Sequence, residues 1–250
     1  MKTPSIKTQL ILYLSFFLGY LSLKDRDIAF LFCALIAVIS AGVIEGLILY
    51  IKNKKLSVSE SSIISGLIIG FVLSCDQPWW MFSLASLLAI SSKHFLCVNK
   101  KHIFNPAAFG IFILIVVFGA QTQWKGTYLW YFIVPIGFYF VYKIRKLEVI
   151  IGYSLAALGL FGIQAFLQNV SLWDIFGYLS YFYIFVMLIE PKTTPVKPQA
   201  KIVFGIGVGV LIFILTEMGL RFDTELCALL VMNLAAPWLN KFSMKPLLTF

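Results

Sequence analysis

The sequence predicts an all-α integral membrane protein with about ten transmembrane helices in two inverted five-helix halves. Three observations support this fold class. The 250 residues are 60% hydrophobic and only 12% charged, with a mean hydropathy of +0.93, whereas soluble domains carry about 25% charged residues. The apolar residues form separate segments of helical length. The basic residues gather between alternate pairs of these segments. The lipid bilayer is therefore the predicted surrounding of most of the chain.

Ten apolar segments are the predicted spans, in a single polytopic domain with no soluble insertion. They are residues 8–23, 28–51, 61–75, 78–90, 104–119, 129–142, 147–167, 172–189, 200–216 and 222–240. Segments 61–75 and 78–90 are short, because a crossing helix needs about 20 residues. Two alternatives stay open for residues 61–90: two short spans, or one re-entrant hairpin.

The basic residues predict the orientation of the chain. Sixteen of the twenty fall on the side of the N-terminus: Lys2, Lys7, Lys52, Lys54, Lys55, Lys93, Lys100, Lys101, Lys143, Arg145, Lys146, Lys192, Lys197, Lys201, Lys241 and Lys245. The other side holds Lys24, Arg26, Lys125 and Arg221. Cytoplasmic loops are enriched in Lys and Arg, so both termini are predicted to be cytoplasmic. Since these residues lie at membrane edges, the pI near 9.4 indicates lipid contact and predicts no nucleic-acid partner.

The span count also predicts an internal repeat. Five spans per half reverse the direction of the second half, so halves of about 1–125 and 126–250 are expected to be inverted relative to each other. Gly205, Gly207 and Gly209 lie inside an apolar segment, where small residues allow helices to pack closely. The sequence contains no catalytic motif and no metal-binding motif. Cys33, Cys75, Cys97 and Cys227 form no Cys-x-x-Cys pair and are predicted to be small buried hydrophobes.

Glu45 is an ionisable side chain at membrane depth, where a charge costs roughly 2.5–3.5 kcal/mol or more. It lies near the end of segment 28–51, between Gly42 and Gly46. One interpretation turns it toward other helices or a wet cavity. The other brings it to the cytoplasmic edge, paired with Lys52 or Lys54.

The start of segment 104–119 is the first candidate site. Asn105 is a good N-cap, and Pro106 suits the first helical turn, where a missing N–H costs nothing. The free N–H groups and the helix dipole favour an anion, and nearby lysines such as Lys93 reinforce that field. The alternative is a well-capped helix without a ligand.

Residues 190–198 are the second candidate site, with three prolines in the nine residues. Proline prevents helix continuation, so a stiff loop is expected at the cytoplasmic face. Glu190 offers a carboxylate, and Thr193 and Thr194 offer hydroxyls. The loop is predicted to bind a polar ligand, to contact a partner subunit, or merely to link two spans. Both candidate sites lie at the same predicted face, and we expect them to form one site.

Several motifs together resemble the NqrB/RnfD family, the membrane subunits of sodium-pumping NADH:quinone reductase and of Rnf electron-transport complexes. In chain order they are Ser-Gly-Leu-Ile-Ile-Gly at 65–70, Pro-Trp-Trp at 78–80, Lys-His at 93–94, Ile-Phe-Asn-Pro-Ala-Ala at 103–108, Glu-Pro-Lys-Thr-Thr-Pro at 190–195, Ile-Val-Phe-Gly at 202–205 and Met-Asn at 232–233. The resemblance covers about residues 61–240. It implies ten spans in two inverted halves, in agreement with the independent span count.

The resemblance also bears on cofactors. Family members carry FMN joined through phosphate to a threonine, in a Ser-Gly-Ala-Thr type motif on a long insert between the fifth and sixth spans. Here that connection is only residues 119–128; it contains Thr122 and Thr127 but not the motif. Covalent FMN is therefore not expected, and the chain looks like a compact relative. A non-covalent flavin, FMN or riboflavin, is the remaining cofactor hypothesis, with Lys93, Asn105, Pro106, Glu190, Thr193 and Thr194 as its binding residues.

The resemblance implies an RnfD/NqrB-like subunit of an electron-transport system. Other membrane redox subunits would be its partners, in a bacterial-type inner membrane. A runner-up hypothesis from another class is a small-solute or ion transporter on the same inverted-repeat scaffold.

Overall fold

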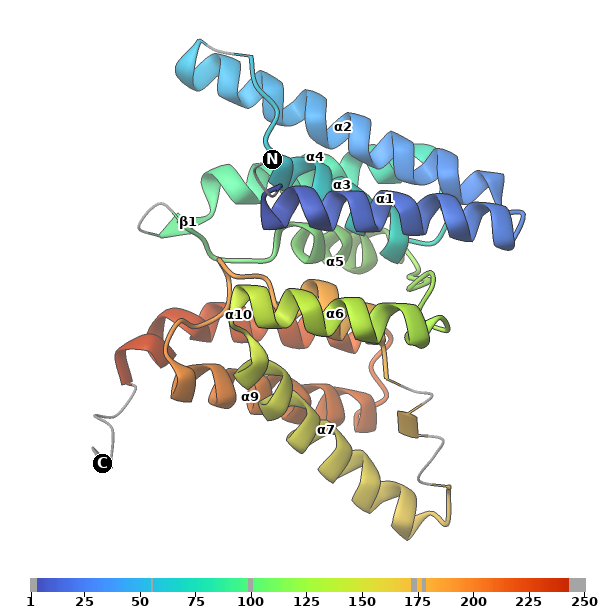
Figure 1. Ribbon diagram of the computed structural model, residues 1–250, viewed down its shortest axis with the longest axis vertical. Helices are drawn as coiled ribbons and strands as arrows, with labels where there is room; N and C mark the ends of the chain where they lie inside the picture. Colours follow the sequence, from blue (N-terminus) through green and yellow to red (C-terminus); the bar gives the residue numbers. More distant parts are fainter. Residues whose placement is uncertain (1–3, 55, 99–100, 172–174, 177–178, 243–250) are drawn as a thin grey trace. The chain divides into compact units, whose positions relative to one another are not determined.

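The computed structural model describes residues 4–54, 56–98, 101–171, 175–176 and 179–242. The chain forms two compact units, residues 1–127 and 128–250, and each is described by itself. In Figure 1 the colours run from blue to green through the first unit and from yellow-green to red through the second.

The described part of the first unit contains five α-helices and one short β-hairpin. These elements are α1 (Ile6–Lys24), α2 (Ile28–Asn53), α3 (Glu60–Val72), α4 (Trp79–Phe95), β1 (Cys97–Val98), β2 (Lys101–His102) and α5 (Pro106–Phe118). Polar caps set where the first two helices begin: the Ser5 hydroxyl accepts a hydrogen bond from the Thr8 N–H at 3.0 Å, and the Asp27 carboxylate accepts one from the Phe30 N–H at 2.9 Å.

Helix α2 is the centre of packing in the first unit. It lies against α3 and α4, while α4 packs on α5 and α1 packs on α3. Small residues allow the close approach of α2 and α3. A Cβ atom on Gly66 would lie 2.6 Å from the Cα of Val38, and one on Gly70 would lie 2.6 Å from the Cα of Ala34. The two backbones are therefore in direct contact, as is common between membrane helices.

The second unit contains α6 (Trp130–Ile144), α7 (Leu147–Leu167), the π-helix η1 (Tyr183–Met187), α9 (Pro198–Glu217) and α10 (Thr224–Phe242). Helix α7 packs along α9, α10 packs on α9, and α6 packs on η1. A Cβ atom on Gly209 would lie 2.8 Å from the Ala156 Cβ of α7, and one on Gly207 would lie 2.5 Å from the Met232 Cε of α10. The prediction that these glycines serve helix packing is confirmed.

The two units share an order of packing. In the first unit α2 lies on α4 and α4 lies on α5, and in the second unit α7 lies on α9 and α9 lies on α10. The inverted relation between the halves stays a prediction.

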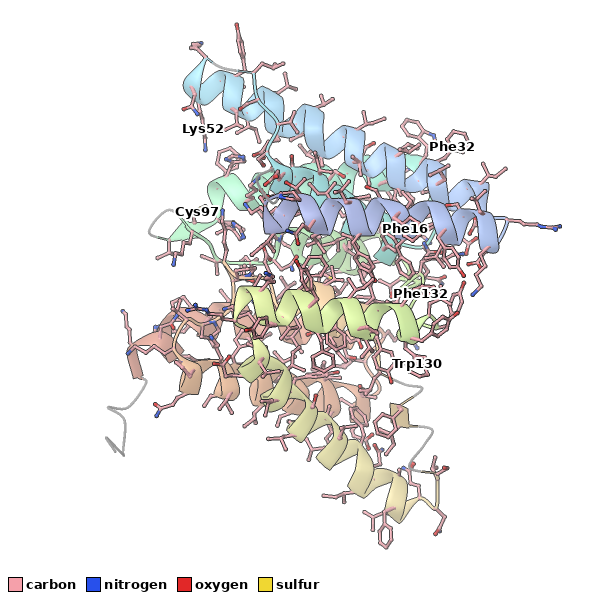
Figure 2. All side chains as sticks on the ribbon, in the orientation of Figure 1. Phe16, Phe32, Lys52, Cys97, Trp130 and Phe132 are labelled. Atoms are coloured by element: carbon pink, nitrogen blue, oxygen red, sulfur yellow. The ribbon has the colours of Figure 1, made fainter. Side chains whose placement is uncertain are left out.

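The predicted all-α membrane fold class is confirmed, because the described elements other than the short β1–β2 hairpin are helices, most of them apolar. Among the described residues, four helices, α1, α2, α7 and α9, are long and apolar enough to cross a membrane. Their outward side chains are apolar: Phe16 is 70% exposed and Phe32 is 60% exposed (Figure 2). Such surfaces are expected where lipid surrounds a helix.

The count of ten spans stays a prediction. Residues 61–90 form two separate helices, α3 and α4, but the 13 residues of α3 reach only about 20 Å at 1.5 Å per residue. A hydrocarbon core is about 30 Å thick. The predicted span 172–189 lies partly outside the described residues, at 172–174 and 177–178; its described end contains η1.

Cys97 corrects one expectation from the sequence. It is exposed on β1 rather than buried (Figure 2), because the chain leaves α4 at Phe95 and turns into the hairpin. Cys33 is buried, as expected, while Cys75 and Cys227 are intermediate.

Reporter fusions test the predicted orientation. A reporter that is active only in the cytoplasm should be active when fused after Phe250 and inactive when inserted into residues 121–125. We expect this difference because the basic residues are in excess on the side of the termini, which is typical of the cytoplasmic side. A full-length fusion with the reporter after Lys54 serves as a second cytoplasmic control. Equal activity at Phe250 and at 121–125 would contradict the ten-span arrangement.

Candidate functional site

Asn105 begins α5 as predicted. Its side-chain oxygen accepts a hydrogen bond from the Ala108 N–H at 3.1 Å, and its backbone oxygen accepts one from the Phe109 N–H at 3.0 Å. Pro106 occupies the first turn. Asn105 is only 2% exposed, and Gly110, one turn further along, packs directly against the Ala85 carbonyl of α4. The capped start of α5 is therefore embedded in the first unit.

Lys93 belongs to a buried charged cluster, which we call the Glu45 cluster (Glu45, Ser59, Lys93 and His94). The Lys93 Nζ lies 2.8 Å from one oxygen of Glu45, and the His94 Nε2 lies 2.9 Å from the other. The Ser59 hydroxyl donates to Glu45 at 2.8 Å. The side chains of Lys93 and Glu45 are 9% and 2% exposed. Together they join the end of α2, the start of α3 and the end of α4.

The Glu45 cluster settles the two interpretations of Glu45. The carboxylate faces other helices, and its partners come from α4 and from the residue before α3. Pairing with Lys52 or Lys54 was the wrong alternative. The Lys52 Nζ instead donates to the His94 carbonyl at 3.5 Å and lies 5.4 Å from the centre of the Phe95 ring. The Lys54 Nζ lies over the Tyr50 ring. A helix turns residues nine apart to different faces, so sequence proximity to Lys54 was misleading.

The proline loop, residues 190–198, is held by its own side chains. The Thr194 hydroxyl donates to the Glu190 carbonyl at 2.8 Å, and the Thr193 hydroxyl donates to the Glu190 carboxylate at 3.4 Å. Thr193 and Thr194 are 3% and 4% exposed. The predicted stiffness of the loop therefore has a second source besides proline, namely this set of internal hydrogen bonds.

Three residues outside the predicted site set hold the proline loop or the backbone next to it. The Lys146 Nζ donates to the Pro195 carbonyl at 2.7 Å, and the Asn233 amide donates to the Thr193 carbonyl at 3.4 Å. The Lys201 Nζ donates to the Arg145 carbonyl at 2.6 Å. Both lysines are buried. Their only sequence signal was membership of a basic group, which pointed to lipid rather than to the loop.

The six predicted site residues fall into two groups. Lys93, Asn105 and Pro106 belong to the first unit, and Glu190, Thr193 and Thr194 belong to the second. Within each unit, the contacts above tie these residues to the protein itself. A common site for both groups stays a prediction.

The model of the NQR2, RnfD, RnfE family matches residues 5–131 and 136–247, which is nearly the whole chain. The chain belongs to this family. The resemblance that the motifs indicated is thereby confirmed.

Individual relatives match shorter parts of the chain than the family model does. The RnfD protein of the ion-translocating oxidoreductase complex of Yersinia enterocolitica is 29% identical over 136 residues, which is 50% of this chain and 34% of the relative. The corresponding protein of Escherichia fergusonii is 31% identical over 99 residues, 38% of this chain and 28% of the relative. That of Buchnera aphidicola is 34% identical over 77 residues, 30% of this chain and 22% of the relative. The chain thus aligns with about a third of these relatives or less.

The connection between α5 and α6 is where the NQR2, RnfD, RnfE family resemblance places covalent FMN. Here it lies along the end of α3: the Gln123 N–H donates to the Val72 carbonyl at 2.8 Å, and Thr122 forms a β-bridge with Leu73. The Thr127 hydroxyl oxygen is buried and has no hydrogen-bond partner in the described part of the chain. A buried hydroxyl is poorly placed to receive a phosphoryl group.

We therefore expect no flavin to stay attached to the denatured chain. A denaturing gel of the purified protein should show no fluorescent band under ultraviolet light, because the attachment motif is missing and the Thr127 hydroxyl is buried. Thr122→Ala and Thr127→Ala variants are the matched controls. A fluorescent band that disappears in either variant would contradict this prediction.

A threonine variant tests whether the proline loop is scaffold or site. Thr193→Val combined with Thr194→Val keeps the side-chain shape and removes two hydroxyls. Two hydrogen bonds at about 0.5–1.5 kcal/mol each predict a loss of about 1–3 kcal/mol in unfolding free energy, measured by thermal unfolding in detergent. Thr216→Val, at an exposed position of α9, is the control. If the double variant and Asn105→Gly both express normally and retain full activity, the two segments are scaffold and the site prediction is wrong.

Proposed function

We propose that the chain is an RnfD-type membrane subunit of an ion-translocating electron-transport complex. The observation that carries the proposal is the family match across residues 5–131 and 136–247. The named relatives are subunits of an ion-translocating oxidoreductase complex. They do not favour the transporter hypothesis.

The structure supports a scaffold role within such a complex. Long apolar helices with exposed aromatic side chains suit a bilayer or the neighbouring membrane subunits. The polar side chains of the Glu45 cluster and of the proline loop bind one another and the backbone. Partners of the chain are therefore proposed to be other membrane redox subunits, in an inner membrane with both termini in the cytoplasm.

A non-covalently bound flavin is the finer part of the functional hypothesis. The polar side chains predicted to hold it make contacts with the protein: Lys93 with Glu45, Asn105 with the start of α5, and both threonines with Glu190. We assign no electron-transfer step to these residues. The flavin hypothesis rests on the family resemblance alone.

The proposal is tested by purifying the tagged chain from native membranes in mild detergent. We expect other membrane redox subunits to co-purify in fixed ratio. The absorbance spectrum before and after acid denaturation then shows whether a flavin is present and whether it is released. The Gly205→Leu variant, which should disrupt α7–α9 packing, controls for non-specific association. A chain that purifies alone and moves a solute across vesicles unaided would contradict the proposal and favour a transporter.

A further inference from the structure

Helix α3 stops short of the level at which its neighbour α2 begins. Gly70 of α3 faces Ala34 of α2 in direct backbone contact. From that contact α3 continues for two residues, to Val72, whereas α2 extends six residues in the same direction, to Ile28. At 1.5 Å per residue, α3 ends about 6 Å short of the start of α2. The connection between α5 and α6 (residues 119–126, which we call the strap) lies against this end.

The strap supplies hydrogen-bond donors to the end of α3. The last four carbonyl groups of any helix lack partners within the helix. The Lys125 N–H donates to the Phe71 carbonyl at 2.7 Å, and the Gln123 N–H donates to the Val72 carbonyl at 2.8 Å. The Gln123 side-chain nitrogen donates to the Gly70 carbonyl at 3.5 Å. Three of the last four carbonyl groups of α3 are therefore bonded to the strap.

One ion pair ties the strap to the start of α2. The Lys125 Nζ lies 2.7 Å from a carboxylate oxygen of Asp27, the residue that caps α2. It also lies 3.7 Å from Asp25 and 5.5 Å from the centre of the Phe30 ring. The side chains of Lys125 and Asp27 are 20% and 26% exposed. Because both side chains reach water, the pair can separate without leaving a charge in apolar surroundings.

The rest of the strap has the features of a segment that can detach. No residue from 121 to 125 is buried, and a segment with few buried apolar contacts opens at low cost. Trp124 has a φ of 44°, which is strained for a bulky side chain. Glycines with positive φ stand at both ends, Gly119 at 66° and Gly126 at 87°, and glycine accepts large backbone changes. Polar contacts therefore hold the strap closed against backbone strain.

We propose that the strap is a releasable lid on the carbonyl end of α3, with the ion pair of Lys125 and Asp27 as its latch. In the closed position, which the structure shows, the strap provides the donors for that helix end. When the pair separates, the strap turns about its terminal glycines, and water becomes the donor to the three carbonyl groups. The predicted orientation puts the lid on the side opposite the termini. The open lid then exposes the end of α3 to the compartment outside the cytoplasm.

Cys75 is a native reporter of the lid. The Gln123 side-chain nitrogen donates to the Cys75 Sγ at 3.3 Å, and the Gln123 side-chain oxygen accepts from the Cys75 N–H at 3.5 Å. Departure of the strap removes Gln123 and uncovers this half-buried thiol. Two other thiols serve as references. Cys33 is buried in α2 and becomes reactive only when the first unit unfolds, while the exposed Cys97 reports the activity of the reagent.

The test measures how fast N-ethylmaleimide labels each cysteine of the full-length chain, reduced and purified in detergent, with mass spectrometry as the readout. The Lys125→Met and Asp27→Asn variants each remove one charge of the latch, and asparagine still caps α2. We expect each variant to raise the labelling rate of Cys75 about tenfold, which corresponds to about 1.4 kcal/mol in the opening equilibrium. The labelling rates of Cys33 and Cys97 should stay unchanged.

Two further variants make the test specific. The double variant Asp27→Asn with Lys125→Met should label Cys75 no faster than the faster single variant, because both changes break the same pair. Lys24→Met, which removes an exposed lysine at the end of α1, should leave the rate unchanged.

Three results would overturn the proposal. The first is an unchanged rate at Cys75 in both single variants. The second is an equal rise with Lys24→Met. The third is a rate at Cys33 that rises together with that at Cys75, because the strap would then leave only when the first unit unfolds. Since every readout is a labelling rate in the purified chain, the test is independent of the proposed function.

Discussion

Replacing Glu45 by leucine is expected to destabilise the first unit by about 3–5 kcal/mol, since removal of one partner from a buried ion pair leaves the other charge uncompensated. Lys93 loses a carboxylate at 2.8 Å, His94 loses a hydrogen bond at 2.9 Å, and Ser59 loses its acceptor. The expected observation is a large fall in the melting temperature and in the yield of monodisperse protein in detergent.

A double variant separates charge from packing at the Glu45 cluster. Glu45→Leu combined with Lys93→Met removes both charges, so it should be markedly more stable than Glu45→Leu alone. Lys52→Met removes an exposed lysine of the same end of α2 and should change stability by less than about 0.5 kcal/mol. If Glu45→Leu melts like the unchanged protein, the cluster is not structural. Lys93 would then be freer to serve the predicted ligand site.

Gly205→Ala is expected to destabilise the second unit by about 1–3 kcal/mol or more, because overpacking at a tight contact displaces the backbone. The added Cβ would collide with the Val149 carbonyl and would lie 2.7 Å from the Tyr153 backbone nitrogen. Both neighbours are backbone atoms of α7, so no side-chain rotation relieves the clash. Thermal unfolding in detergent measures the effect.

Gly162→Ala is the matched control for Gly205→Ala. Gly162 lies in α7 and has open space where a Cβ would be added. Alanine there should stabilise the helix by roughly 0.5–1 kcal/mol, since glycine is the poorer helix former. The two substitutions are chemically identical and should have opposite signs. Equal effects of the two substitutions would show that the α7–α9 contact at Gly205 does not determine the outcome.

The features that the sequence predicted well are local ones. Segment 147–167 coincides with α7, and Asn105 and Pro106 begin α5 as their residue types require. The glycines of α9 pack as small residues in apolar segments do. Each of these depends on residues within a few positions of one another or on a general rule of helix packing.

The features that the sequence did not predict depend on which helices meet. Glu45 contacts Lys93 and His94 because α2 packs on α4. No sequence pattern near Glu45 predicts that contact. The π-helix at Tyr183–Met187 was not predicted from the sequence. Its Phe185 side chain fills the space beside Gly137 of α6, which is a contact between separate helices. The candidate site was predicted only as two polar segments. The hydrogen bonds within the proline loop depend on its folded backbone, which the sequence did not predict.

Three lysines turn inward, so the protein presents less positive charge to its surroundings than a count of its basic residues suggests. Lys146 and Lys201 are buried and direct their ammonium groups at backbone carbonyls, and Lys93 does the same toward a carboxylate. An anionic phospholipid headgroup therefore meets fewer positive charges than the sixteen that the sequence places on that side. An amine-acylating reagent applied to the folded protein would modify Lys192 and Lys197, which are exposed, long before it reached these three.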